Sequence, residues 1–156
     1  MTATAKERGE ARIEKAYIAG FIDGEGCIYI EKEENKGKYK RHRYQLKISI
    51  SQQDKSPLEF IQKVYGGNFG TTPGGIYKRV PNPIYRLRIT DRKALKLIKE
   101  CLPFFIVKKE HTDIAIEFYK FKDEHVRAYK RTPDNILKEL AAFKEKLHML
   151  NQGKVE

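Results

Sequence analysis

Cysteine and histidine are scarce in this chain, and neither is arranged as a metal site. Among 156 residues there are two cysteines and four histidines. Cys27 and Cys101 lack the close spacing of zinc ligands, and two cysteines make no disulfide framework. The histidines are scattered, at His42, His111, His125 and His148. This pattern argues against a histidine metal site or a histidine-based nuclease motif, and it predicts reduced thiols in an intracellular protein.

Long apolar runs are missing as well. The run at 104–107 is among the longest, whereas a membrane-spanning helix needs about 20 apolar residues. Residues 1–12 are charged and lack the apolar segment of a secretory signal. We therefore expect a soluble intracellular protein, of cytoplasm or organelle, without a membrane partner.

Acidic residues are the scarcer charge, with 21 Asp and Glu against 32 Lys and Arg, and the formal net charge is +11. The imbalance is greatest over residues 36–53, which contain no acid. The basic residues there are Lys36, Lys38, Lys40, Arg41, Arg43 and Lys47. Acids gather instead at Glu31, Glu33 and Glu34 and along the later helical segments. Such a charge distribution is typical of a protein that binds a polyanion, most often nucleic acid.

Hydrophobic periodicity predicts a single domain over residues 1–156, with residues 1–9 frayed, because no linker divides the chain. The expected helices lie at about 10–22, at 56–65 with Ser56 as cap, from Asp91 to about 103, at 108–123 and at 131–156. The expected strands lie at 27–31, 43–51, 68–72, 76–80 and 85–89. Helix-strand-strand units give hairpins, so we predict an α+β fold with an antiparallel sheet, in the order helix-strand-strand-helix-strand-strand-helix.

One face of the predicted sheet is polar and basic. Side chains of this kind grip phosphates and read base edges, and a two-stranded ribbon fits a major groove. Any antiparallel sheet can have a polar solvent face, but the absence of acids from 36–53 favours nucleic acid. The predicted DNA-contacting residues are Tyr29, Lys38, Lys40, Arg41, Arg43, Gln45, Lys47, Ser49, Lys78, Arg79, Arg86 and Arg88.

The most specific stretch is 17–26, YIAGFIDGEG, which joins the first helix to the first strand. Glycines end helices through left-handed dihedrals, so we expect the helix to stop within this stretch. Asp23 and Glu25 then lie at the negative end of a helix, where acids are unfavourable. They could be solvated acids beside a helix cap, but a broken local rule at a tight turn indicates a functional site.

The residues 19–26, AGFIDGEG, resemble the signature of the LAGLIDADG homing endonucleases at almost every position, and the resemblance covers about residues 13–120. It implies an α+β fold with a saddle-shaped DNA-binding sheet and signature helices that form a dimer interface. It also implies that Glu25 is the catalytic acid and a metal ligand, that the Gly24 carbonyl is a further ligand, and that Asp23 helps to organise the turn.

Two peripheral residues complete such sites, by the same resemblance. Gln53, or Gln52 if the alignment shifts by one, corresponds to a glutamine that ends the second strand. Lys108, or its neighbour Lys109, corresponds to a lysine after the Leu-Pro-Phe segment. The expected metal is Mg²⁺, with Mn²⁺ as a second candidate and Ca²⁺ as a substitute that does not support turnover.

Chemistry also favours two copies of the chain. Phosphodiester hydrolysis is served by paired divalent metals, which are held by carboxylates, waters and the phosphate. One signature acid per chain is too few. A stripe of small residues, Ala16, Gly20 and Gly24, would allow two signature helices to pack closely, so that two Glu25 carboxylates converge.

The function predicted from the sequence is a homodimeric, metal-dependent, sequence-specific double-strand DNA endonuclease, encoded in an intron and acting on a long pseudo-palindromic site. Its partners would be double-stranded DNA and a second copy, with no small-molecule substrate. The alternatives are an RNA-binding intron maturase and a non-catalytic DNA-binding protein on the same fold. Glu25 favours cleavage, because a protein that only binds has no need of the acid.

Overall fold

The computed structural model of the chain describes residues 2–34, 42–72, 82–127 and 130–153. Its four-stranded antiparallel sheet with packed helices confirms the predicted α+β class. In chain order the elements are α1 (Ala5–Glu25), β1 (Gly26–Glu34), β2 (His42–Gln52), α2 (Ser56–Tyr65), β3 (Asn68–Thr72), β4 (Ile84–Thr90), α3 (Arg92–Cys101), the short 3-10 helix η1 (Leu102–Phe104), α4 (Lys109–His125) and α5 (Asp134–Asn151). Within the described ranges, no helix is both long and apolar enough to cross a membrane.

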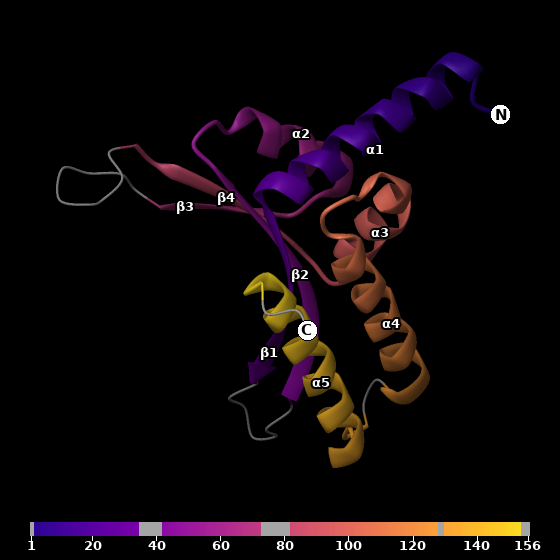
Figure 1. The fold of residues 1–156 in the computed structure, drawn as a ribbon, viewed down its shortest axis with the longest axis vertical. Coiled ribbons are helices and arrows are strands. Elements are labelled where there is room, and N and C mark those ends of the chain that lie inside the picture. The colour runs from indigo at the N-terminus through magenta and orange to yellow at the C-terminus, as the bar shows by residue number, and fades with distance from the viewer. Residues whose placement is uncertain (1, 35–41, 73–81, 128–129, 154–156) are drawn as a thin grey trace.

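The strands lie in the order β1-β2-β4-β3, so β2 is flanked on both sides (Figure 1). The β1–β2 ladder begins with Gly26 opposite Ile50, and the β2–β4 ladder begins with Lys47 opposite Thr90. The start of β2 therefore extends past the end of β4. The end of β2 lies beside the start of β1, which directly follows α1.

Alternation along the strands separates an apolar face from a polar one, as predicted. The buried strand residues on the apolar face are Ile28, Ile30, Tyr44, Leu46, Ile48, Ile50, Leu87 and Ile89. Helix α3 packs on β2 and β4, and α5 packs on β1 (Figure 1). On the opposite face Arg86 and Arg88 are exposed. The polar face is thus the one available to a large partner.

Helix α1 is longer at both ends than its periodicity predicts. Thr4 forms a capping box with Glu7: the Thr4 N–H donates to the Glu7 carboxylate (2.7 Å), and the Glu7 N–H donates to the Thr4 hydroxyl (3.2 Å). Residues 5–9 are therefore helical, and the prediction of a frayed segment is wrong for them. At the other end the helix continues to Glu25, and Gly26 is extended at φ −91°. The predicted left-handed stop is wrong.

Other boundaries differ by a few residues. Ser56 is the first residue of α2 rather than its cap, and its N–H donates to the Asp54 carboxylate (2.9 Å). The helix ends as expected, with Gly66 in the left-handed region at φ 81°. Helix α5 begins at Asp134, three residues later than predicted. The predicted strand at 76–80 lies outside the described residues.

Candidate active site and nucleic-acid interface

The end of α1 presents an exposed carboxylate. Glu25 is the last residue of the helix and is exposed, as is Gly24 before it. Among the residues that the structure describes, none forms a hydrogen bond or ion pair with the Glu25 carboxylate. The last turn contains no basic residue, so the partial negative charge of the helix C-terminus is not neutralised locally. This end of α1 is suited to attract a cation.

Asp23 has a different environment, two residues before Glu25. Its carboxylate accepts hydrogen bonds from three successive backbone N–H groups: Ile106 (2.8 Å), Val107 (3.2 Å) and Lys108 (2.9 Å). The resemblance implies that Asp23 organises the turn at the end of the first helix, but in the structure its carboxylate binds a different turn, the one between η1 and α4. Asp23 thereby fixes a segment more than 80 residues away beside the end of α1.

Lys108 is the residue that this contact places near the signature. It is the N-cap residue of α4 and half-buried, whereas Lys109 is exposed. The Lys108 charge acts on Cys27, the second residue of β1 and two residues after Glu25. Burial raises the pKa of the Cys27 thiol, and the Lys108 ammonium opposes part of that rise. The geometry therefore favours Lys108 over Lys109 as the lysine of the site.

Two further residues near Lys108 were not predicted. His111 is 9% exposed, and its Nδ1 is buried without a hydrogen-bond partner in the described part of the chain. Its pKa is lowered, first by burial and then by Lys108. Asn151 lies close to His111, and its amide donates to the Ile28 carbonyl (2.9 Å). Isolated in the sequence, neither residue carries a spacing signal that could have identified it.

The end of β2 supplies the predicted glutamine. Because Gly26 lies opposite Ile50, the residues after Ile50 run alongside the end of α1. Gln52 is the last strand residue, and its side-chain oxygen accepts from the Gln53 N–H (3.0 Å). Gln53 is exposed and lies in the bend that follows the strand, whereas Gln52 is half-buried. The geometry favours Gln53 over Gln52.

The donor atoms available to a metal are hard oxygens. They are the Glu25 carboxylate and the Gly24 carbonyl, a set that suits Mg²⁺. Within the described ranges, no group of three His, Cys, Asp or Glu side chains could hold a metal ion. The Asp23 carboxylate is occupied by backbone N–H groups. These residues fit a metal ion whose remaining ligands come from outside this chain, such as a second copy of the chain, water or DNA phosphate.

The polar face of the sheet is uneven in its charge. Arg86 and Arg88 are exposed, and Arg86 Nε donates to the Ser51 hydroxyl (3.2 Å). Ser49 and Gln45 are half-buried on the same face. The predicted contacts Lys38, Lys40, Arg41, Lys78 and Arg79 lie outside the described residues. The exposed described cations on this face are therefore Arg86 and Arg88 of β4 and Arg43 of β2.

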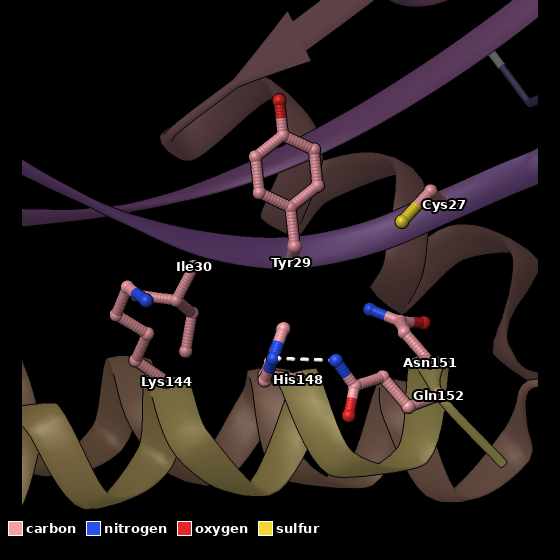
Figure 2. A pocket seen from close by; sticks show the side chains of 7 residues that line it. All are labelled: Cys27, Tyr29, Ile30, Lys144, His148, Asn151 and Gln152. Atoms are coloured by element: carbon pink, nitrogen blue, oxygen red, sulfur yellow. Dashed lines mark hydrogen bonds between the residues drawn. The ribbon is translucent and has the colours of Figure 1, made fainter.

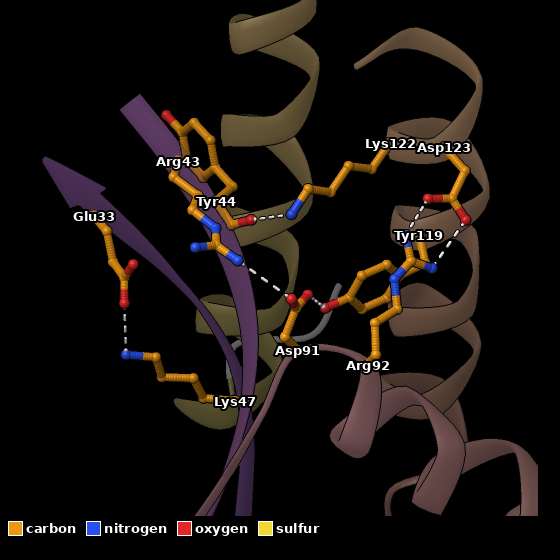
Figure 3. A network of polar contacts seen from close by, with 9 residues as sticks. All are labelled: Glu33, Arg43, Tyr44, Lys47, Asp91, Arg92, Tyr119, Lys122 and Asp123. Atoms are coloured by element: carbon orange, nitrogen blue, oxygen red, sulfur yellow. Dashed lines mark hydrogen bonds and ion pairs between the residues drawn. The ribbon is translucent and has the colours of Figure 1, made fainter. Parts of the chain in front are cut away.

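The cations of β2 are paired with acids that the sequence analysis did not place beside them (Figure 3). Lys47 forms ion pairs with Glu31 and Glu33 of β1, and its side chain is only 9% exposed. Arg43 donates to the Asp91 carboxylate (3.2 Å), which also accepts from the Tyr119 hydroxyl. The acid-free stretch of sequence is therefore not an acid-free surface, because strand pairing brings acids from elsewhere.

A pocket of about 410 Å³ lies between β1 and α5 (Figure 2). Tyr29 points away from α5 and Ile30 points toward it, so the pocket opens at the edge of the sheet. The residues that line it are Cys27, Tyr29, Ile30, Lys144, His148, Asn151 and Gln152. Helix α5 thus contributes polar side chains to this pocket, whereas the ring of Tyr29 projects from the other side of β1.

The small-residue stripe of α1 lies on the surface. Gly20 and Gly24 are exposed, and a Cβ atom at either position would meet nothing within 4 Å. Ala16 is half-buried. The same side of the helix carries Ile13, 71% exposed, and Tyr17, 47% exposed. An apolar, small-residue helix face is therefore open to another backbone.

Comparison with known structures finds the same fold in DNA-bound endonucleases. The homing endonuclease I-CvuI, in complex with the I-CreI target in the presence of Mg, matches at a TM-score of 0.70 and 19% identity, covering 90% of this chain and 83% of that chain. The archaeal intron-encoded homing endonuclease I-Vdi141I, complexed with DNA, matches at 0.63 and 22%, covering 92% and 85%. The LAGLIDADG homing endonuclease I-GzeII, in complex with its DNA target, matches at 0.62 and 20%, covering 83% of this chain but 43% of that chain.

The sequence itself was compared with family models. The model described as "LAGLIDADG endonuclease" matches residues 18–125, which is well over half of the chain and includes most of the signature stretch. The matched range contains Asp23, Glu25, Gln53 and Lys108. The chain therefore belongs to the LAGLIDADG endonuclease family.

Proposed function

We propose that the protein is a homodimeric, divalent-metal-dependent homing endonuclease of the intron-encoded kind, which cuts both strands of a long pseudo-palindromic DNA site. The observation that carries this proposal is the contrast at the end of α1. Asp23 is engaged in holding the Lys108 segment, and Glu25 is exposed and unengaged by any described residue. An acid that forms no contact within its own chain, next to one that holds the fold together, fits a catalytic role better than a structural one.

The Glu25 carboxylate and the Gly24 carbonyl would hold Mg²⁺. When bound, the metal supplies Lewis-acid stabilisation of charge on the scissile phosphate. Two observations support this assignment: the donor atoms are hard oxygens, and no basic side chain in the last turn of α1 competes for them. I-CvuI structures with DNA were obtained in the presence of Mg, with the DNA not cleaved, and in the presence of Ca, which supports the use of a divalent metal.

The remaining roles fall to Lys108 and Gln53. Hydrolysis forms a bond from phosphorus to a water oxygen and breaks one bond from phosphorus to a sugar oxygen. The Lys108 ammonium would stabilise the negative charge that develops on the phosphate oxygens. The Gln53 amide, exposed at the end of β2, would orient the attacking water by hydrogen bonding. Asp23 acts as a positioning residue, because it contacts the Lys108 backbone.

A twofold dimer completes this site. Each chain offers one unengaged signature acid, and a duplex has two strands to cut. The exposed Gly20 and Gly24 allow a second α1 to approach closely, and closed twofold symmetry matches a pseudo-palindromic target. The match covers 83% of the I-CvuI chain but only 43% of the I-GzeII chain. One copy of this fold is therefore most of I-CvuI and less than half of I-GzeII.

Sequencing of cut ends tests the proposal. The protein would be incubated with Mg²⁺ and a randomised duplex library, with Glu25→Gln as a matched control. We expect paired cuts on opposite strands within one recurring sequence, and none with the variant. Binding to DNA without cleavage would favour the non-catalytic alternative, and a preference for structured RNA would favour a maturase.

A further inference from the structure

The β1–β2 ribbon contains a lysine between two glutamates on the polar face of the sheet. Lys47 Nζ lies 3.1 Å from Glu33 Oε1 and also forms an ion pair with Glu31 (Figure 3 shows the Glu33 contact). The Lys47 side chain is 9% exposed, whereas those of Glu31 and Glu33 are 45% and 41% exposed. The two glutamate side chains of this cluster are therefore much more accessible to a partner than the lysine side chain.

The pairing keeps Lys47 charged but unavailable. Burial has the largest single effect on its pKa and lowers it, but the hydrogen bonds to Glu31 and Glu33 and the charges of these two acids together raise the pKa above its ordinary value. Two carboxylates against one ammonium leave the cluster with a net charge of −1. A phosphate that approached this part of the ribbon would meet repulsion, on a protein whose formal net charge is +11.

An ionised carboxylate on a DNA-facing ribbon accepts hydrogen bonds and donates none, so it can bind only those DNA groups that carry an N–H donor. In the major groove the donors are the exocyclic amino groups of cytosine (N4) and adenine (N6), and acidic side chains pair mostly with the cytosine N4, whereas phosphates and groove acceptors offer a carboxylate no proton. Phosphate contacts give affinity without sequence information, and base contacts give specificity. A cluster that offers a base-selective acceptor in place of a phosphate contact therefore lowers the affinity for DNA in general and raises the discrimination between DNA sequences.

We propose that Glu31 and Glu33 are specificity-determining residues: they hold Lys47 away from the phosphates, and they accept only from a base amino group, so that the ribbon binds DNA of unmatched sequence weakly. The inference rests on the proposed function, since it assumes that this face meets DNA. It assigns the phosphate contacts of this face to other cations, of which Arg86 and Arg88 are exposed.

The test is a set of charge-neutralising variants in a binding assay. Glu31→Gln/Glu33→Gln keeps the size of both side chains and an oxygen acceptor for Lys47, so the fold should be retained, which thermal unfolding would verify. The probe is a mixed-sequence duplex, with binding measured over a range of salt. If Lys47 becomes free to contact a phosphate, the slope of log affinity against log salt steepens by about 0.9 for each protomer bound. This corresponds to an about threefold larger loss of affinity between 50 and 200 mM salt.

Two comparisons make the result specific to the cluster. Glu117→Gln/Glu139→Gln changes the net charge by the same amount at exposed positions on α4 and α5, and we expect a much smaller gain. Adding Lys47→Met to the Glu31→Gln/Glu33→Gln variant should remove the gain. An equal gain in the α4/α5 control would overturn the proposal, as would a gain that survives the loss of Lys47.

The binding assay also separates this inference from the proposed function. If the parent protein binds the duplex but the cluster variant behaves like its control, the inference fails and the endonuclease proposal stands. If the parent protein fails to bind any duplex at low salt, both fail. Single Glu31→Gln and Glu33→Gln variants should each give an intermediate slope.

Discussion

The two acids in the last turn of α1 are two residues apart, yet their surroundings are opposite. The Asp23 carboxylate accepts three backbone N–H groups from the η1–α4 connection. The Glu25 carboxylate is exposed, and no described residue binds it. Two acids of one signature can therefore have different roles. Asp23 binds backbone N–H groups and fixes the structure of the site, whereas Glu25 is accessible to a ligand.

The largest expected effect is on the exposed acid. Glu25→Gln keeps the size of the side chain and removes its charge, so cleavage should fall by at least about 10²–10³-fold, as for the loss of one group that stabilises transition-state charge. The free energy of unfolding should stay equal or rise slightly, because an acid at a helix C-terminus is mildly unfavourable. Single-turnover cleavage and urea unfolding check both. Cleavage at the parental rate would show that Glu25 is not catalytic.

Gly20→Leu would block the proposed approach of a second α1 helix, and it leaves the hydrogen bonds of Asp23 unchanged. The new side chain would occupy the open face of α1, where the proposed second helix approaches. We expect a monomeric mass by sedimentation and loss of cleavage, with the fold intact. Gly70→Leu, at another exposed glycine with nothing within 4 Å of a Cβ atom, is the control and should remain dimeric. A dimer that persists in Gly20→Leu would exclude this face as the interface.

Asp23→Asn should reverse the pattern of effects. The amide retains one acceptor oxygen but loses the charge that three N–H groups share, and a hydrogen bond to a charged group contributes about 1.5–3 kcal/mol. We expect the free energy of unfolding to fall by that amount, with a smaller loss of cleavage as Lys108 shifts. Asp113→Asn, at an exposed position on α4, should change neither quantity. Unchanged stability in Asp23→Asn would mean that these hydrogen bonds contribute little to folding.

The smallest effect concerns the buried neighbour of Lys108. The folded-state pKa of His111 lies below about 6.5, lowered by burial and by Lys108, with Asn151, Glu110 and Asp23 opposing. Above that pH His111 is neutral in both states and contributes nothing. As the pH falls below it, the unfolded chain binds the proton first, so stability declines.

Urea unfolding between pH 7 and pH 5 measures this decline. His111→Gln should make the decline shallower, because the buried imidazole is gone. An identical slope in His111→Gln and the parent would show that His111 titrates normally.

Sequence patterns predicted the framework of the fold, because it depends on local regularities. Alternation placed Leu87 and Ile89 inside and Arg86 and Arg88 outside, as the structure has them. The family signature singled out Glu25. The helix boundary was wrong because glycine propensity is a weak local term: the capping box and the buried face of α1 sustain the helix through Gly20 and Gly24.

What could not be predicted are contacts between distant parts of the chain. Asp23 binds N–H groups 83–85 residues away, and no spacing rule reports such a distance. Lys47 lies in an acid-free stretch, but the β1–β2 register brings Glu31 and Glu33 within reach of it. The distribution of charged residues along the sequence therefore did not predict the charge of this surface, because the sheet brings together residues that are far apart in the sequence.

The hydrogen bond from Asn151 to the Ile28 carbonyl has a consequence for handling the protein. β1 is an edge strand, and an uncovered edge offers its backbone groups to strands of other molecules, which leads to aggregation. Helix α5 packs on β1, and Asn151 satisfies one backbone carbonyl of that strand. A chain shortened before Asp134 would expose this edge. A low yield of this shortened protein would then reflect aggregation through the exposed β1 edge, and it would not show that α5 takes part in DNA cleavage.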